Sequence, residues 1–181
     1  MTAFIPKTRR DFRKVKKLYK QAFPKYERKP FRVIRAMQKR KKTDVFCFAD
    51  REGFLGFATT LNGEKLILID YLAIKKDRRG KGYGSEILCY LLNYYQDHGV
   101  FLEIETPDPD GENYSGKLRR KAFYEKAGFV PMHVRVTLFG VDMELLGTRC
   151  TLDYTDYHAF YRETYPCAAN NITDITERGG I

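Results

Sequence analysis

The sequence predicts an α/β fold built on a sheet of mixed strand direction. Two observations carry this prediction: three strand patterns follow one another after two helices, and the next strand comes only after another helix. Strands joined by short turns pair antiparallel, whereas strand–helix–strand units make parallel pairs. We therefore expect residues 66–74 and 100–106 to lie side by side and parallel in a mixed sheet.

Two helices open the chain. Apolar residues recur at helical spacing from Phe12 to Phe23, lysines and arginines stand between them, and Pro24 ends the pattern. A second helix fits residues 31–42, with an apolar residue at each of Phe31, Ile34 and Met37. Both patterns are typical of amphipathic helices that pack one face against a sheet.

The three consecutive strands follow these helices. VFCFAD (45–50) and FLGFATTL (54–61) flank a short turn at residues 51–53, which predicts a hairpin. Asn62-Gly63 is a strong turn signal and leads into LILIDYLAI (66–74). The three strands should therefore form an antiparallel meander.

The remaining elements alternate. We expect a helix at 85–98, a strand at 100–106, a polar loop at 107–116, a helix at 117–128, two strands on either side of Phe139-Gly140, and a last helix at 153–165. Residues 1–166 are predicted to form a single domain, and residues 167–181 a polar, mobile tail.

Composition limits the class of protein. The chain has 181 residues, of which 43% are hydrophobic, so it can bury one sizeable core, and disorder of the whole chain is excluded. No apolar run approaches the ~20 residues of a membrane helix, and the charged N-terminus predicts no signal peptide. The four cysteines show no metal-ligand spacing. These features favour a cytoplasmic protein with reduced thiols, without metal or membrane association.

The charge is concentrated at one end of the chain. Residues 1–42 contain 17 Lys or Arg residues but only two acids, Asp11 and Glu27, in a protein of net charge +10. Solvated helix faces explain such a distribution, and so does a surface for an acidic partner such as nucleic acid, the ribosome or a polyanionic coenzyme. Charge alone does not decide between them.

A glycine-rich segment, DRRGKGYGS, lies between the strand at 66–74 and the next helix. It fits neither a P-loop nor a dinucleotide-binding fingerprint, because it lacks the glycine spacing of both. Glycines let the backbone approach phosphates closely, the first amides of a helix attract anions, and Arg79 and Lys81 add positive charge. We expect this segment to bind a pyrophosphate, with Ser85 capping the helix. The alternative is a glycine-rich loop without a ligand.

Two motifs resemble the GNAT superfamily of N-acetyltransferases. The family's pyrophosphate loop, Gln/Arg-x-x-Gly-x-Gly/Ala, is matched by residues 79–84, and its Phe-Tyr-x-Lys-x-Gly-Phe motif is matched by residues 123–129. The resemblance implies a GNAT-like, mostly antiparallel sheet with a splayed parallel strand pair, acetyl-CoA as the acetyl donor and an amine as acceptor. It assigns cofactor binding to Leu72, Ala73, Ile74, Arg79, Gly80, Lys81, Gly82, Tyr83, Gly84 and Ser85.

The resemblance also implies the proton transfers of the reaction. Tyr124 occupies the family's general-acid position, although it also fits a core aromatic of an amphipathic helix. Glu103 occupies the position of the base, or of the group that orders a water chain to it, with a solvated strand face as the alternative. Many members carry an asparagine where this chain has Lys117, and Asn113 is the candidate to replace it.

Three further carboxylates are candidates for acceptor binding. Asp70 interrupts an apolar strand, so it needs either a polar site or a bonded partner. Glu105 shares a strand face with Glu103, and two carboxylates so placed can raise each other's pKa. Glu27 stands in the loop that covers the acceptor in the family. Together they favour a cationic amine, either a small molecule or a peptide.

Other functional classes stay open. A basic nucleic-acid- or ribosome-binding module on the same fold is less favoured, because the basic face of this segment has no interleaved aromatic residues and the segment has no recognised binding motif. A protein that senses acyl-CoA without turnover is a third possibility. The sequence does not identify the acceptor or the oligomeric state, for which a homodimer is one option.

Overall fold

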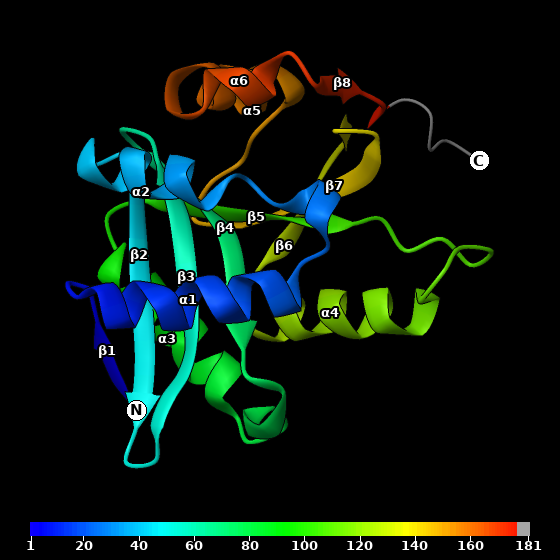
Figure 1. Ribbon diagram of the computed structural model, residues 1–181. Helices are drawn as coiled ribbons and strands as arrows, with labels where there is room; N and C mark the ends of the chain where they lie inside the picture. Colours follow the sequence, from blue (N-terminus) through cyan, green and yellow to red (C-terminus); the bar gives the residue numbers. More distant parts are fainter. Residues whose placement is uncertain (177–181) are drawn as a thin grey trace. The chain divides into compact units, whose positions relative to one another are not determined.

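The strands of the computed structural model form one mixed sheet, and the structure describes residues 1–176. The strands are β1 (Thr2–Phe4), β2 (Thr43–Asp50), β3 (Gly53–Asn62), β4 (Leu66–Ile74), β5 (Gly99–Glu105), β6 (Val130–Leu138), β7 (Val141–Thr148) and β8 (Ile172–Asp174). They are ordered β1-β2-β3-β4-β5-β7-β6-β8 (Figure 1). β4 and β5 pair in parallel through Leu66–Leu68 and Gly99–Phe101, and β5 pairs antiparallel with β7. The predicted mixed sheet with its parallel pair is confirmed.

The helices are close to the predicted ones. They are α1 (Arg9–Ala22), α2 (Phe31–Lys39), α3 (Tyr83–Tyr94), α4 (Tyr114–Lys126), α5 (Tyr154–Thr164) and α6 (Pro166–Ala169), with short 3₁₀ turns η1 (Lys25–Glu27) and η2 (Lys76–Arg78). α2 ends three residues before the expected Lys42, because Lys41 adopts a left-handed backbone conformation with φ of 59°.

The described chain divides into two compact units, and each is described by itself. The first consists of residues 1–62 and 69–94, and the second of residues 63–68 and 95 onward. β4 contributes residues to both units. The single domain expected over residues 1–166 therefore stays a prediction.

The first unit packs helices on both faces of its strands. α1 and α2 lie over one face of β2 and β3 (Figure 1), where Val15, Tyr19 and Phe57 belong to a buried apolar cluster. On the other face, Phe46 and Phe48 of β2 make ring contacts with Tyr90 of α3. Alternate residues of β2 thus point to opposite helical layers, as the period of a strand requires.

The second unit packs α5 against its strands. Tyr157 and Tyr161 of α5 are almost completely buried, and Phe101 of β5 makes ring contacts with Tyr157 and Phe160. α6 follows α5 directly and lies beside it in Figure 1.

Part of the expected polar tail belongs to the second unit. Residues 166–174 contain α6 and β8, and β8 pairs antiparallel with β6 through Val136–Leu138. Ala168, Ala169, Ile172 and Ile175 are buried. The prediction of a mobile tail is therefore wrong for residues 167–176, because these four apolar side chains anchor the segment; residues 177–181 lie outside the described residues.

Candidate functional site

The glycine-rich loop connects β4 and η2 to α3 in the first unit. Gly80 and Gly82 have φ of 74° and 81°, in a region that side chains disfavour, and the space around both positions is open. Within residues 1–176, no backbone N–H from Gly80 to Gly84 donates a hydrogen bond; the next amide, that of Ser85, donates to the Gly82 carbonyl. Five consecutive free amides at the N-terminal end of a 12-residue helix are suited to bind an anion.

Two exposed basic side chains belong to this loop, and a serine follows it. Arg79 is exposed, and its Nε donates to the Ile74 carbonyl at 3.1 Å. Lys81 is exposed as well. Ser85 lies in the first turn of α3, which begins at Tyr83, so the prediction that Ser85 is the capping residue is wrong. The helix begins earlier than expected because Gly82 accepts its first hydrogen bonds.

Arg78 anchors the loop through ion pairs, a role that no local sequence pattern indicates. Its side chain is 9% exposed and contacts Asp50 at 3.3 Å and Glu52 at 2.8 Å. The Tyr83 hydroxyl donates to Asp50 at 2.8 Å, and this hydrogen bond lowers the pKa of Asp50. Asp50 thereby ties both ends of the loop to the β2–β3 hairpin, a contact between residues that are far apart in the sequence.

The end of β4 lies directly before the loop. Tyr71 and Ala73 are buried in the apolar cluster, whereas Leu72 and Ile74 are only partly buried. A Cβ at Gly56 of β3 would collide with the Ala73 carbonyl oxygen. Glycine at this position therefore allows the close approach of β3 to the strand segment for which the family resemblance predicts cofactor binding.

Asp70 of β4 is already paired. Lys29 Nζ lies 2.6 Å from Asp70 Oδ1, and the two side chains are 10% and 7% exposed. Burial raises the pKa of Asp70, while the nearby ammonium of Lys29 opposes this shift. Of the two possibilities for Asp70, a polar site or a bonded partner, the structure contains the partner.

The loop before α2 is held on β4 by tyrosines. The Tyr71 hydroxyl donates to the Glu27 carbonyl at 2.7 Å and accepts from the Lys29 backbone N–H at 3.2 Å. Tyr19 donates to the Lys29 carbonyl at 3.1 Å. Burial raises the pKa of both tyrosines, so both stay protonated donors. Glu27 is thus fixed through its backbone, next to the Lys29–Asp70 pair.

Glu103 and Glu105 of β5, in the second unit, have different partners. Glu103 Oε1 accepts from Tyr157 at 2.7 Å and from Tyr161 at 2.8 Å. Glu105 forms ion pairs with Lys117 at 2.9 Å and Arg120 at 3.8 Å. Lys117, which stands where the family often has asparagine, therefore neutralises a carboxylate on the neighbouring strand. Asn113 is the N-cap residue of α4, and its side chain makes no capping hydrogen bond.

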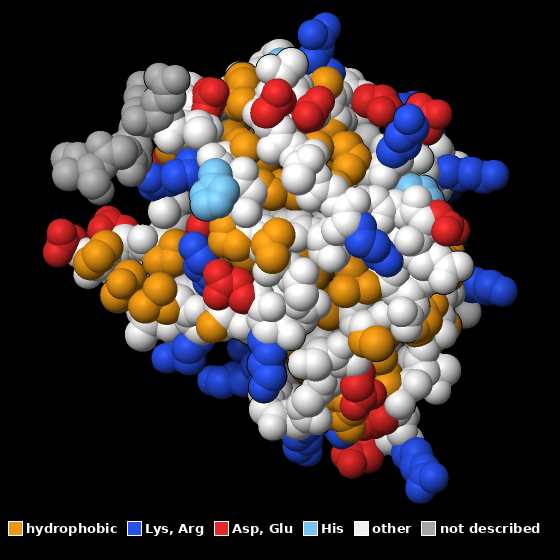
Figure 2. Space-filling model, turned by 180° about the vertical axis from the view of Figure 1, so that it is seen from behind, with side chains coloured by type: hydrophobic (Ala, Val, Ile, Leu, Met, Phe, Trp, Pro, Cys, Tyr) orange, Lys and Arg blue, Asp and Glu red, His pale blue; other side chains and the backbone are white. Residues whose placement is uncertain are grey.

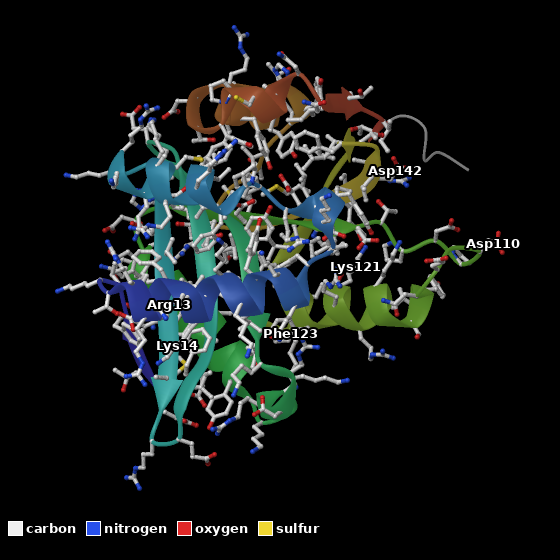
Figure 3. All side chains as sticks on the ribbon, viewed as in Figure 1. Arg13, Lys14, Asp110, Lys121, Phe123 and Asp142 are labelled. Carbon is white, nitrogen blue, oxygen red and sulfur yellow. The ribbon has the colours of Figure 1, made fainter. Side chains whose placement is uncertain are left out.

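Tyr124 differs from these carboxylates. Its ring contacts Phe123 (labelled in Figure 3) and Phe129, with centroids 5.1 and 6.0 Å away. Its side chain is partly buried, and its hydroxyl has no hydrogen-bond partner among residues 1–176. Burial raises the pKa of Tyr124 above its usual value of 10.0, so the hydroxyl keeps its proton at neutral pH and can act as a donor.

A pocket of about 670 Å³ lies against another face of α4. Leu118 and Lys121 line it, and Lys121 (Figure 3) pairs with Glu144 at 2.7 Å. Figure 2 shows hydrophobic side chains beside acidic ones at the left of that view, where the loop before α4 and its first turns lie; Tyr114 and Leu118 are the exposed large apolar residues of this helix. None of the predicted site residues lines this pocket.

The described residues contain neither a membrane-spanning helix nor a metal-binding cluster of side chains. No helix in residues 1–176 is long and apolar enough to span a membrane. In the same residues, no cluster of three or more His, Cys, Asp or Glu side chains could hold a metal ion.

Comparison with a family model establishes the family. The model described as "Acetyltransferase (GNAT) domain" matches residues 41–131, which include the glycine-rich loop and the segment around Tyr124. This match covers half of the chain. The protein therefore belongs to the GNAT acetyltransferases, as the two sequence motifs indicated.

Individual proteins resemble the chain more weakly. YjbC from Bacillus subtilis (strain 168), which carries the name of an acetyltransferase, is 32% identical over 66 residues; the match covers 36% of this chain and 32% of YjbC, about a third of its length. A structure of a GNAT-family protein from Bacteroides thetaiotaomicron has a TM-score of 0.73 at 19% identity, covering 91% of this chain and 98% of that one.

A second solved structure contains ligands. The spermidine N-acetyltransferase from Vibrio cholerae, in complex with CoA and spermine, has a TM-score of 0.62 at 15% identity and covers 81% of this chain and 94% of that one. At such identities these likenesses establish the fold, and the fold alone does not define the acceptor.

Proposed function

We propose that this chain is an acetyl-CoA-dependent N-acetyltransferase that transfers an acetyl group to a primary amine by direct attack in a ternary complex. One observation carries the proposal: the five free amides from Gly80 to Gly84 lie beside the exposed cations Arg79 and Lys81. Amides and cations so arranged suit the pyrophosphate of a coenzyme. Membership of the GNAT acetyltransferases supports the same donor.

The proposed chemistry requires three groups. Glu103, held by two tyrosine hydroxyls, removes a proton from the acceptor ammonium, directly or through water. The free amine attacks the thioester carbonyl, and a backbone N–H of Leu72, Ala73 or Ile74 stabilises the oxyanion. The carbon–sulfur bond then breaks, and Tyr124 gives its proton to the departing thiolate. The new amide nitrogen still carries one extra proton, which passes through water to the Tyr124 phenolate. The products are therefore the neutral amide and free CoA, with Tyr124 reprotonated and the first proton on Glu103.

The acceptor is the least constrained part of the proposal. Asp70, Glu103 and Glu105 already have partners in the folded chain, so a cationic acceptor would have to compete with Lys29 or with the cations of α4 to reach two of them. The basic segment at residues 1–42 also disfavours acceptors with several positive charges. A primary amine on a small molecule or a peptide of low positive charge fits better than a polyamine. A cytoplasmic location and a homodimer remain expectations.

Calorimetric titration with acetyl-CoA tests the donor site. The wild type should bind on the order of micromolar, and Gly82→Glu should weaken binding by about 100-fold or more, because a carboxylate beside the phosphates adds like-charge repulsion. Gly140→Glu is the matched control, since Gly140 also has φ of 81° and open space around it but lies in the β6–β7 turn. It should bind acetyl-CoA as the wild type does.

The other outcomes separate the alternatives. Equal loss in both variants would mean that backbone strain, not phosphate repulsion, explains the result. A wild type that does not bind acetyl-CoA would refute the enzyme. Tight binding without thiol release on a panel of primary amines would instead indicate a protein that senses acyl-CoA.

A further inference from the structure

The outer face of α1 carries a dense group of positive charges. Seven of its 14 residues are Lys or Arg, and all seven are exposed: Arg9, Arg10, Arg13, Lys14, Lys16, Lys17 and Lys20. Figure 3 labels two of them, Arg13 and Lys14. At about 100° per residue they cover a face about 160° wide, opposite the buried side of the helix. We call this surface the α1 basic face.

These charges are not used by the fold. Within residues 1–176, none of the seven side chains forms an ion pair or donates a hydrogen bond. The acid of the helix, Asp11, belongs to a capping box with Thr8 at the first turn. Like charges this close repel one another and destabilise the helix. A role in packing or capping therefore does not explain the seven cations.

The number of charges per length of α1 is similar to that of one strand of a duplex. A helix of 14 residues is about 21 Å long, so the α1 basic face presents on average one cation per about 3 Å of helix axis. One strand of a duplex presents one phosphate per about 3.4 Å of duplex axis. We propose that the α1 basic face binds the phosphate backbone of double-stranded nucleic acid, independently of the sequence and of the acetyl acceptor.

The apolar side of α1 argues for a duplex over a single strand. Proteins that bind single strands stack bases on exposed aromatic rings. The two aromatic residues of α1, Phe12 and Tyr19, are 8% and 2% exposed and pack into the first unit. Arg35 of α2 covers Phe12 from outside, with its guanidinium 3.7 Å from the ring centroid. The α1 basic face thus offers charge without a surface for base stacking.

The test measures binding of fluorescently labelled 20-base-pair RNA and DNA duplexes by anisotropy between 50 and 200 mM salt. With up to about seven phosphate contacts, affinity should fall by up to about 10³- to 10⁴-fold over this range. The double variant Arg13→Glu/Lys17→Glu should bind at least about 10-fold more weakly at 50 mM, with a salt dependence smaller by about two phosphate contacts. Preference for one duplex over the other would identify the natural form.

The control variant is Lys65→Glu/Arg162→Glu, which changes the net charge equally at two exposed positions outside α1. It should bind both duplexes nearly as the wild type does, and all proteins should show the same melting temperature. Equal weakening by both variants would overturn the proposal, because only net charge would then matter. Absence of salt-dependent duplex binding, or tighter binding to phosphatidylserine vesicles than to both duplexes, would overturn it too.

Discussion

The glycine-rich loop and the carboxylates of β4 and β5 differ in how far the folded chain uses their polar groups. The amides from Gly80 to Gly84 donate to nothing in the described residues, whereas Asp70, Glu103 and Glu105 all have close partners. The amides at the start of a helix have no intrahelical partner, so those of this exposed loop are available to bind an anion. The ion pairs and hydrogen bonds of these carboxylates can be explained by their contribution to stability alone. A catalytic role therefore needs separate evidence for each of them.

Tyr124 resembles the amides of the loop in one respect: its hydroxyl has no hydrogen-bond partner in residues 1–176. We expect Tyr124→Phe to lower turnover by about 10²- to 10⁴-fold, the usual contribution of a general acid. Acetyl-CoA affinity and stability should stay close to those of the wild type, since the lost hydroxyl bonds nothing in the fold. Thiol release with the best amine of the panel, and calorimetry, measure the two quantities.

The control for this variant is Tyr114→Phe, which removes a hydroxyl from an exposed residue of the same helix. Because burial raises the pKa of Tyr124 above 10.0, its hydroxyl keeps its proton at any lower pH. Deprotonation of Tyr124 should therefore not reduce wild-type turnover below about pH 10. Full turnover in Tyr124→Phe would place the general acid elsewhere, and the free hydroxyl would then be only a consequence of packing.

The sequence predicts this contrast in part. The loop could be predicted because its features are local: glycines, cations and a helix start within nine residues. The odd position of Asp70 in an apolar strand predicts a need for a partner, but the partner, Lys29, lies 41 residues away and gives no local signal. The same holds for Tyr157 and Glu103, 54 residues apart. Only folding brings these groups together.

Prediction of the fold from the sequence has the same limit, because only local patterns can be recognised. The parallel pairing of β4 and β5 follows from the helix between them, which fixes the handedness and direction of the crossover. β1, α6 and β8 have only three or four residues, too few to show a period. Their positions depend on partners such as β6, so the composition of residues 167–176 suggested a tail where the structure has a helix and a strand.

The pair of Lys29 and Asp70 should give the largest loss of stability. Lys29→Met leaves a carboxylate of 7% exposure without its counter-ion, which should lower the free energy of unfolding by about 3–5 kcal/mol near neutral pH. The folded pKa of Asp70 is raised above its unfolded value, and losing Lys29 raises it further. The variant should therefore lose stability as pH rises above about 4 and recover it on acidification.

Urea unfolding at pH 4.5 and pH 7.5 measures this pH dependence. Lys25→Met, which removes an exposed cation from the same loop, is the matched control and should change stability by no more than about 0.5 kcal/mol. A loss below about 1 kcal/mol for Lys29→Met, equal at both pH values, would mean that water reaches Asp70 in solution. In that case the carboxylate would be available to an acceptor after all.

The smallest effect is expected at Glu105. Its side chain is 25% exposed, and pairs of this kind contribute about 1 kcal/mol or less, so Glu105→Gln should shift stability by no more than that and the difference should shrink at high salt. Glu112→Gln, in the exposed loop before α4, is the control. Turnover should stay within about threefold of the wild type, since Glu103 is the proposed base.

If Glu105→Gln abolished turnover while the fold stayed intact, the base would be Glu105, and a carboxylate that is paired with Lys117 would then be the catalytic one. A bonded partner would then no longer distinguish structural from catalytic carboxylates in this protein.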